Sequence, residues 1–320
     1  MVKSPSASPP EAGVTPMPSV SSLASMAISL QEIERLRHAA RERRWALIGV
    51  FSGAWIALIL AFVFGMENGM ESLELGHLVL LAGGSLVLYG MGLHGPANAY
   101  RQAFKDQVIG RLVAERYEGA RYSAEKGIGE TEFESSGLYQ QGVDRYHTED
   151  LIEARVGETP FRMAEIHAEY RTGVGKSTRW HTIFKGRFIV ARFSKRFHGR
   201  TLVLSEDWRP FGISGLEKAA LEDPAFEKLF AVYSTDQVEA RYLLSLSLME
   251  RLVAAEAKLD ADVQAAFVND HFILAIPDHH DRFEPPPFWS MAPLISEDDV
   301  QTYLADIGLA ADLIGELNLE

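Results

Sequence analysis

The chain has 320 residues, a formal net charge of −13 and no cysteine. The lack of cysteine excludes disulfides, thiolate zinc sites and cysteine nucleophiles. After residue 112 the chain holds 36 Asp and Glu against 22 Lys and Arg, so this part lacks the basic footprint of a nucleic-acid-binding protein.

The first 44 residues divide by composition into two segments. Residues 1–22 are rich in Pro, Ser and Ala and carry almost no large apolar side chains, which predicts a disordered tail. Residues 23–44 are predicted to form a juxtamembrane helix, because their apolar residues recur at helical spacing. These residues are Leu30, Ile33, Leu36 and Ala40. Either this helix is a solvated extension of the segment that follows, or it serves self-association.

Two apolar stretches follow, at residues 45–66 and 75–93, and neither contains Asp, Glu, Lys or Arg. Each is close to the ~20 residues that a helix needs to cross the hydrocarbon core of a bilayer. Basic residues flank the pair on its outer sides only: Arg35, Arg37, Arg41, Arg43 and Arg44 before it, and Arg101, Lys105 and Arg111 after it. Because Lys and Arg near membrane ends stay on the cytoplasmic side, we predict a transmembrane hairpin over residues 45–95 in a bacterial inner membrane. Both termini are then cytoplasmic.

Two alternatives to a membrane hairpin fit the sequence less well. A signal peptide has a shorter apolar run and does not follow 44 preceding residues. A buried hairpin of a soluble protein rarely needs two such charge-free runs so close together. Small residues mark the packing faces of the predicted spans: Gly49, Gly53, Gly83 and Gly84. Such residues let helices approach closely in lipid, either within the hairpin or in a homo-oligomer.

The remainder of the chain is predicted to be one cytoplasmic domain. Residues 96–118 form a polar connecting helix, and residues 119–320 form the domain itself. Alternating apolar and polar residues over 160–171 predict a half-buried strand. Further strands are predicted at residues 151–156, 180–193, 201–204, 230–233, 263–268 and 272–276.

Three helix starts are recognisable in the second half of the domain. The N-cap candidates are Asp223 before Pro224, Asp236 with Glu239, and Ser296. We expect one long helix after Asp236. Its apolar stripe consists of Val238, Tyr242, Leu246, Met249 and Val253. The predicted fold class is α+β: a strand-rich sheet or small barrel with an inserted helix and a C-terminal helix.

Two local motifs suggest chemistry without defining it. The segment 173–178 resembles the end of a phosphate-binding loop, but Tyr170 stands where that motif needs Gly, and a strand pattern follows it. We therefore interpret it as a hairpin turn. The metal-ligand candidates are His271, His279 and His280. They are weak candidates, since adjacent histidines on an extended segment point to opposite faces.

Basic and aromatic residues are interleaved between residues 184 and 200 of this otherwise acidic domain. The basic residues are Lys185, Arg187, Lys195, Arg196 and Arg200. One hypothesis is a docking face for acidic lipid headgroups or an acidic partner. The alternative is that the aromatic side chains point into the core and the cations into solvent, as on ordinary strands.

Three segments resemble one bacterial family. They are residues 180–186 (WHTIFKG), 198–204 (HGRTLVL) and 226–252, which includes VYSTDQVEARYLL. Together they resemble the domain-of-unknown-function family numbered 3137, over roughly residues 120–315. The resemblance implies a membrane hairpin before the domain and no known catalytic residue or cofactor. It also implies a LemA-like membrane protein as a partner.

These observations favour a non-enzymatic inner-membrane protein without a cofactor, whose cytoplasmic domain binds a protein partner or a lipid headgroup. One alternative is a membrane-tethered metal-dependent hydrolase that uses the histidines of residues 271–281. A second alternative is an accessory subunit of a membrane transport assembly, with a partner that contacts the glycine faces of the hairpin.

Overall fold

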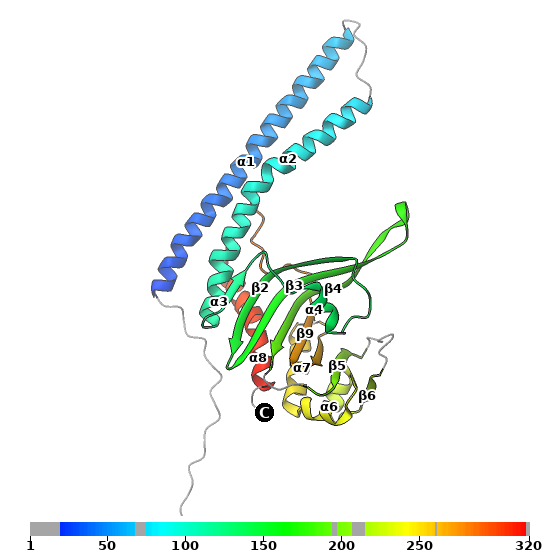
Figure 1. Ribbon diagram of the computed structural model, residues 1–320. Coiled ribbons are helices and arrows are strands. Elements are labelled where there is room, and N and C mark those ends of the chain that lie inside the picture. Colours follow the sequence, from blue (N-terminus) through cyan, green and yellow to red (C-terminus); the bar gives the residue numbers. More distant parts are fainter. Residues whose placement is uncertain (1–19, 68–74, 194–196, 207–214, 260, 318–320) are drawn as a thin grey trace, which may run out of the picture.

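A computed structural model describes residues 20–67, 75–193, 197–206, 215–259 and 261–317 (Figure 1). Its most prominent feature is a pair of long helices that rises from a strand-rich domain. Helix α1 spans Val20–Glu67 and α2 spans Leu75–Phe104. Of the predicted disordered tail, residues 1–19 lie outside the described residues, whereas Val20 already belongs to α1.

The second helix does not end at the predicted membrane boundary. It continues through one π-helical turn, η1 (Lys105–Ile109), into α3 (Gly110–Arg116). These three elements form one continuous helical rod, and the predicted connecting helix is its lower part. By length and composition, the helical segments Leu30–Phe64 and Val79–Arg116 are each apolar enough to cross a membrane, and the most apolar window of each is unburied.

The domain is built on one antiparallel sheet. The strands are β1 (Arg121–Ser123), β2 (Arg145–Val156), β3 (Thr159–Thr172), β4 (Arg179–Arg192), β5 (Arg200–Ser205), β6 (Glu217–Ala219), β7 (Phe230–Ser234), β8 (Gln264–Val268) and β9 (His271–Pro277). Their order is β1-β2-β3-β4-β9-β8-β5-β7-β6. With β1 and β6 at its two edges the sheet is open, so the sheet rather than the barrel is the outcome.

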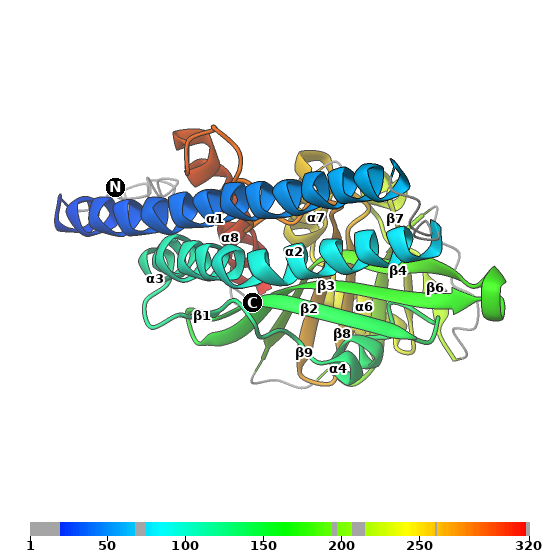
Figure 2. The same ribbon diagram turned by 90° about the horizontal axis from the view of Figure 1, so that it is seen from above.

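Helices cover the two faces of this sheet unequally. One face packs against the lower α2 with η1 and α3, and against α7 (Leu246–Leu259) and α8 (Glu297–Leu317). This is the larger core, and it includes Met163, Ile189 and Ile307. The other face is covered by α4 (Glu130–Ser135), whose Phe133 packs on Phe188. Figures 1 and 2 show α3 and α8 close to the end of the sheet where α2 enters the domain.

Most local predictions hold. The carboxylate of Asp223 caps α5 (Pro224–Glu227), accepting from the backbone N–H of Ala225 at 2.8 Å. Ser296 caps α8 by accepting from the N–H of Asp299 at 3.2 Å. The short 3₁₀ turn η2 (Gly175–Ser177) joins β3 to β4, so no helix follows the glycine-rich segment.

The single long helix expected after Asp236 is wrong. The chain forms α6 (Gln237–Leu243) and then α7, because the hydroxyl of Ser245 accepts from the N–H of Leu248 and starts a new helix. The stripe is split accordingly: Val238 and Leu246 are exposed, whereas Met249 is buried.

Candidate functional site

The π-helical turn places a buried lysine where the helical rod meets the sheet. Lys105 is 2 % exposed. Its Nζ lies 2.8 Å from Oε2 of Glu149, 2.8 Å from Oδ2 of Asp150 and 2.8 Å from Oε1 of Glu284. An ammonium group has three N–H donors, so each donor has one carboxylate. π-Helical turns inside α-helices frequently mark functional positions.

A bulge in β2 supplies one of these carboxylates. The β2–β3 register shifts between Glu149 and Ile152, and Asp150 has a φ of 60°. This left-handed conformation is uncommon for residues other than glycine, and Asp is one of those that tolerate it. The hydroxyl of Tyr122 donates to the second oxygen of Asp150. The bulge therefore presents Asp150 to Lys105 from mid-strand.

Two rows of polar residues cross the sheet beside this cluster. In register, Glu149 pairs with Glu165 and Glu165 with Arg187. Two residues along each strand, His147 pairs with His167 and His167 with Lys185. Residues two apart on a strand share a face, so all six lie on the face where Met163 and Ile189 belong to the core. The polar rows begin where that core ends.

Glu165 is the most electrostatically perturbed member of the rows. Burial, reinforced by the nearby negative charge of Asp150 and Glu149, raises its pKa to about 8. The backbone N–H of Arg282 donates to its Oε1 at 3.1 Å and opposes this shift only in part. For Lys105, burial lowers the pKa, but the attraction of Asp150, Glu149 and Glu284 outweighs it and raises the pKa above its usual value. Near neutral pH the cluster therefore combines a charged Lys105 with a largely protonated Glu165.

A second ion cluster binds the C-terminal helix to the sheet. Arg187 of β4 is 2 % exposed, and its Nη1 lies 2.6 Å from Oδ1 of Asp306 on α8. Asp278, after β9, accepts from Arg282 and from the N–H of His280. Burial raises the pKa of Asp278, but these hydrogen bonds and Arg187 outweigh it and lower the pKa. The segment from Asp278 to Glu284 thus connects both clusters.

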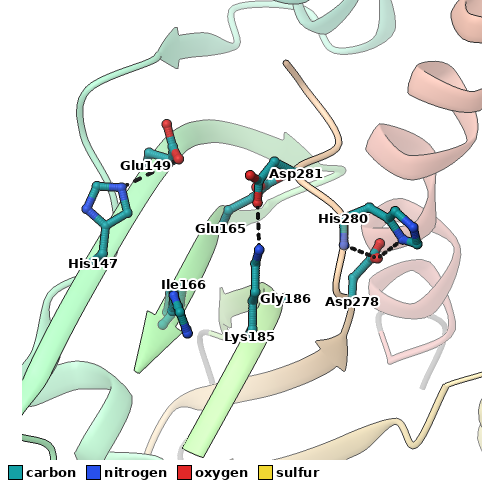
Figure 3. A pocket seen from close by; sticks show the side chains of 10 residues that line it. His147, Glu149, Glu165, Ile166, Lys185, Gly186, Asp278, His280 and Asp281 are labelled. Carbon is teal, nitrogen blue, oxygen red and sulfur yellow. Dashed lines mark hydrogen bonds and ion pairs between the residues drawn. The ribbon is translucent and has the colours of Figure 1, made fainter. Parts of the chain in front are cut away.

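A small cavity of about 240 Å³ opens between the polar rows and this segment (Figure 3). Its lining includes Glu165, Lys185 and Asp281, and the Nζ of Lys185 lies 3.0 Å from Oδ1 of Asp281. The volume is below the ~300 Å³ at which sites for small organic ligands usually begin. Within the described part of the chain, no group of three or more His, Asp or Glu side chains is arranged to hold a metal ion. The carboxyl of Glu165 can bind and release a proton, and the ion pairs of Lys105 and Arg187 connect helices to the sheet.

The predicted metal ligands are not gathered at one point. His271 begins β9 and its Nδ1 lies 2.9 Å from Oδ1 of Asp270. His280 follows the other end of β9 and its Nδ1 lies 3.2 Å from Oδ1 of Asp278. The strand between them is seven residues long, ~20 Å at the usual rise. His279 is exposed.

The predicted docking residues also have different environments. Arg187 is buried against Asp306 and is not part of a surface, a correction that follows from its position on the covered face of β4. Lys185 lines the cavity, and Arg200 is half-buried beside Gly137. Lys195 and Arg196 lie outside the described residues.

The glycines chosen for helix packing face open space. A Cβ at Gly49, Gly53, Gly83 or Gly84 would meet nothing within 4 Å. The close approach is instead at Gly92, where a Cβ would lie 2.9 Å from Cδ1 of Leu47. The residues that sequence reasoning missed are Asp150, Glu284 and Asp306. Asp150 and Asp306 adjoin apolar residues, a signal that could have pointed to them, whereas Glu284 precedes three prolines and carries no such signal.

Residues 182–319 match the family described as Protein of unknown function (DUF3137). This confirms the resemblance. The DUF3137 segment begins within β4 and contains Arg187, Asp278, Glu284 and Asp306. It does not include residues 120–181, to which the expected resemblance also extended, and so leaves out Glu149, Asp150 and Glu165.

Other comparisons are more distant. The crystal structure of the mycobacterial trehalose monomycolate transport factor A, TtfA, is similar with 12% sequence identity and a TM-score of 0.34, over 64% of this chain and 94% of that chain. A likeness at this score establishes neither a common fold nor a common function. The comparison with curated proteins finds no match.

Proposed function

We propose that this protein is a non-enzymatic inner-membrane protein. In this proposal α1 and α2 cross the membrane, and the sheet domain binds a protein partner in the cytoplasm. The observation that carries the proposal is the bare apolar surface of the two helices. Large apolar side chains are more than 45 % exposed along both of them: Val50, Ile56, Ile59, Leu60, Val63 and Phe64 on α1, and Val79, Leu80, Leu81, Leu86, Val87, Leu88 and Met91 on α2.

Surface of this extent is costly in water, at ~25 cal/mol per Å² of apolar area, and is the expected surface in lipid. The basic residues beside Trp45 and after α2 support a cytoplasmic domain by the positive-inside rule. The contacts of Lys105 with Glu149, Asp150 and Glu284, here called the Lys105 joint, attach the base of α2 to the sheet domain. They support a proposal in which the domain and the membrane helix move together.

A partner surface is supported on the helices α6 and α7. Val238 is 77 % exposed and Leu246 is 60 % exposed. Leu246 lines a groove of about 710 Å³ together with Leu244, Met249 and the acidic Glu250. Such a rimmed apolar surface fits an apolar segment flanked by Lys or Arg. The hydrolase alternative needs its histidines around one ion, and among the described residues His271 and His280 lie at opposite ends of β9.

Membrane insertion is tested by placing charges in the predicted spans. Leu60→Arg with Leu88→Arg is expected to release the protein into an alkaline carbonate extract, because an arginine near the bilayer centre costs ~2.5–3.5 kcal/mol. Val238→Arg, on the exposed face of α6, is the matched control and stays with the membrane. Retention of the double variant in the pellet would contradict the proposal.

Orientation and partner binding are tested with single cysteines, which are clean probes in a chain without native cysteine. A cysteine at Val238 should react with an impermeant maleimide only after cells are opened. A photo-crosslinker at Leu246 should capture one protein with a basic, apolar segment, whereas the same group at Val174, 88 % exposed on the β3–β4 turn, should not. Equal capture at both positions would contradict the partner surface.

A further inference from the structure

A loop from the far end of the sequence lies against the base of α1. The carbonyl oxygens of Phe288 and Ser290 accept from Arg41, and those of Ser290 and Ala292 accept from Arg37. The shortest of these contacts joins Nη2 of Arg37 to the oxygen of Ser290 at 2.6 Å. Figure 1 shows this orange-brown segment running up from the domain toward the helical pair.

The loop fixes a tryptophan at one level of α1. The guanidinium of Arg44 lies 5.3 Å from the ring centroid of Trp289. The rings of Phe288 and Trp289 meet edge-on, with their centroids 4.9 Å apart. Arg44 immediately precedes Trp45, the first residue of the charge-free stretch. Trp289 therefore stands where α1 passes from charged to apolar surface.

The same loop exposes its apolar side chains while its backbone is bound. Phe288 is buried, but Trp289 is 55 % and Met291 is 86 % exposed. The exposed indole and thioether lie two residues apart on one loop, where together they form an apolar surface that a hydrophobic neighbour would cover. Tryptophan is enriched at membrane–water interfaces, where its ring is in the apolar layer and its N–H reaches water.

The positive charge of α1 beside the loop favours a negatively charged neighbour. Arg41, Arg43 and Arg44 outnumber the single acid, Glu42, in this turn of α1. The cytoplasmic leaflet carries negative charge that attracts juxtamembrane basic residues. With α1 inserted from Trp45 onward, the neighbour at the level of Trp289 is the headgroup layer.

We propose that the loop Phe288–Ala292 is a second membrane contact, with Trp289 and Met291 inserted into the anionic headgroup layer beside α1. This rests on the proposed membrane insertion of α1 and α2. The contact gives the sheet domain a third attachment to the lipid surface and fixes its orientation relative to the bilayer.

The test uses nitroxide labels on single cysteines in the full chain, reconstituted in vesicles that contain anionic lipid. Labels are placed at Met291, at Leu60 within the predicted span, and at Val238 as the aqueous reference. Power-saturation EPR compares collisions with oxygen, which concentrates in lipid, and with a polar nickel complex, which does not. The Met291 label is expected to collide more with oxygen and less with nickel than the Val238 label, at a depth short of the Leu60 label.

Two results would overturn the proposal, and they are distinguishable. A Met291 label that matches Val238, while Leu60 reports lipid, shows that the hairpin inserts but the loop does not. A Leu60 label that also matches Val238 shows that the hairpin does not insert, and then the proposed membrane anchoring is lost with the loop. Because Met291 is almost fully exposed, its substitution does not disturb the fold.

Discussion

The Nζ of Lys105 lies 2.8 Å from Oδ2 of Asp150, and this pair joins the helical rod to the middle of a strand. Asp150 is 2 % exposed, as is Lys105. Two charges withdrawn from water are stable only when all their donors and acceptors have partners. Glu149, Glu284 and Tyr122 complete that requirement. Any movement of Lys105 relative to the sheet has to break this set.

Lys105→Met is therefore expected to destabilise the protein strongly. The substitution leaves buried carboxylates without a counter-ion, a loss that typically costs about 3–5 kcal/mol. The measurement is the thermal midpoint in mild detergent, followed by tryptophan fluorescence. Adding Asp150→Asn should recover part of the loss, since residues in one network are not additive.

The matched control for Lys105 is Arg101→Ala. Arg101 also pairs with Glu284, its Nε 2.8 Å from Oε2, but its side chain is 56 % exposed. Exposed ion pairs contribute about 0–1 kcal/mol, so the midpoint should hardly move. If Lys105→Met and Arg101→Ala lower the thermal midpoint equally, the burial of Lys105 does not account for the stability that these ion pairs contribute.

Glu165 gives the protein a specific pH dependence. Its pKa is raised from 4.5 in a free carboxyl to about 8 in the folded chain. The folded state then binds more protons than the unfolded state between these values. The stabilising contribution is complete below pH 4.5 and falls by up to ~1.4 kcal/mol per pH unit as pH rises toward 8.

Glu165→Gln keeps the shape and removes the titration. The thermal midpoint of Glu165→Gln minus that of the wild type should increase steadily from pH 5 to pH 8, because only the wild type loses stability as Glu165 loses its proton. Glu153→Gln, on the same sheet but exposed, provides the comparison and should run parallel to the wild type. A difference curve for Glu165→Gln that is flat across this range would refute a raised pKa at Glu165.

The sequence predicts what depends on near neighbours. The alternation of Ala164, Ile166 and Ala168 with polar residues gives β3, and the caps Asp223 and Ser296 give the helix starts, because each signal is complete within a few residues. Even there, Ser245 ended the expected helix, since its hydroxyl competes for the backbone.

The joint could not be predicted in the same way. In sequence, Lys105 is one of several basic residues that flank the two predicted spans, and Asp150 is a polar residue just before the strand predicted at residues 151–156. Their pairing depends on a bulge and on the angle at which the rod meets the sheet, and neither is encoded by local periodicity. Likewise, the loop at Trp289 is a proline-rich connection in sequence, and only the tertiary fold places it against Arg37 and Arg41.

Gly186→Ala tests the close approach of β4 to β9 beside the cavity. Gly186 has a φ of 150°, and a Cβ there would lie 2.1 Å from the carbonyl oxygen of Ile276. Because the obstacle is backbone, the strands must separate, with an expected loss of about 1–3 kcal/mol. Gly129→Ala, where a Cβ meets nothing within 4 Å, should leave the thermal midpoint within experimental error. Equal midpoints for the two variants would contradict the tight contact.

The ion pair of Arg187 with Asp306 tests whether Arg187 stabilises the packing of α8 on the sheet. If Arg187 serves to hold α8 on the sheet, Arg187→Met alone should cost about 3–5 kcal/mol, because Asp306 is left buried without its nearest counter-ion. Arg187→Met with Asp306→Leu should recover most of that loss, since an apolar pair of similar volume often replaces a buried ion pair without penalty. Thermal midpoints in one detergent give both values. If the double variant is as unstable as the single one, Arg187 has a further partner that matters more than Asp306, and Asp278, with Oδ2 3.9 Å from Nη2, is the next to test.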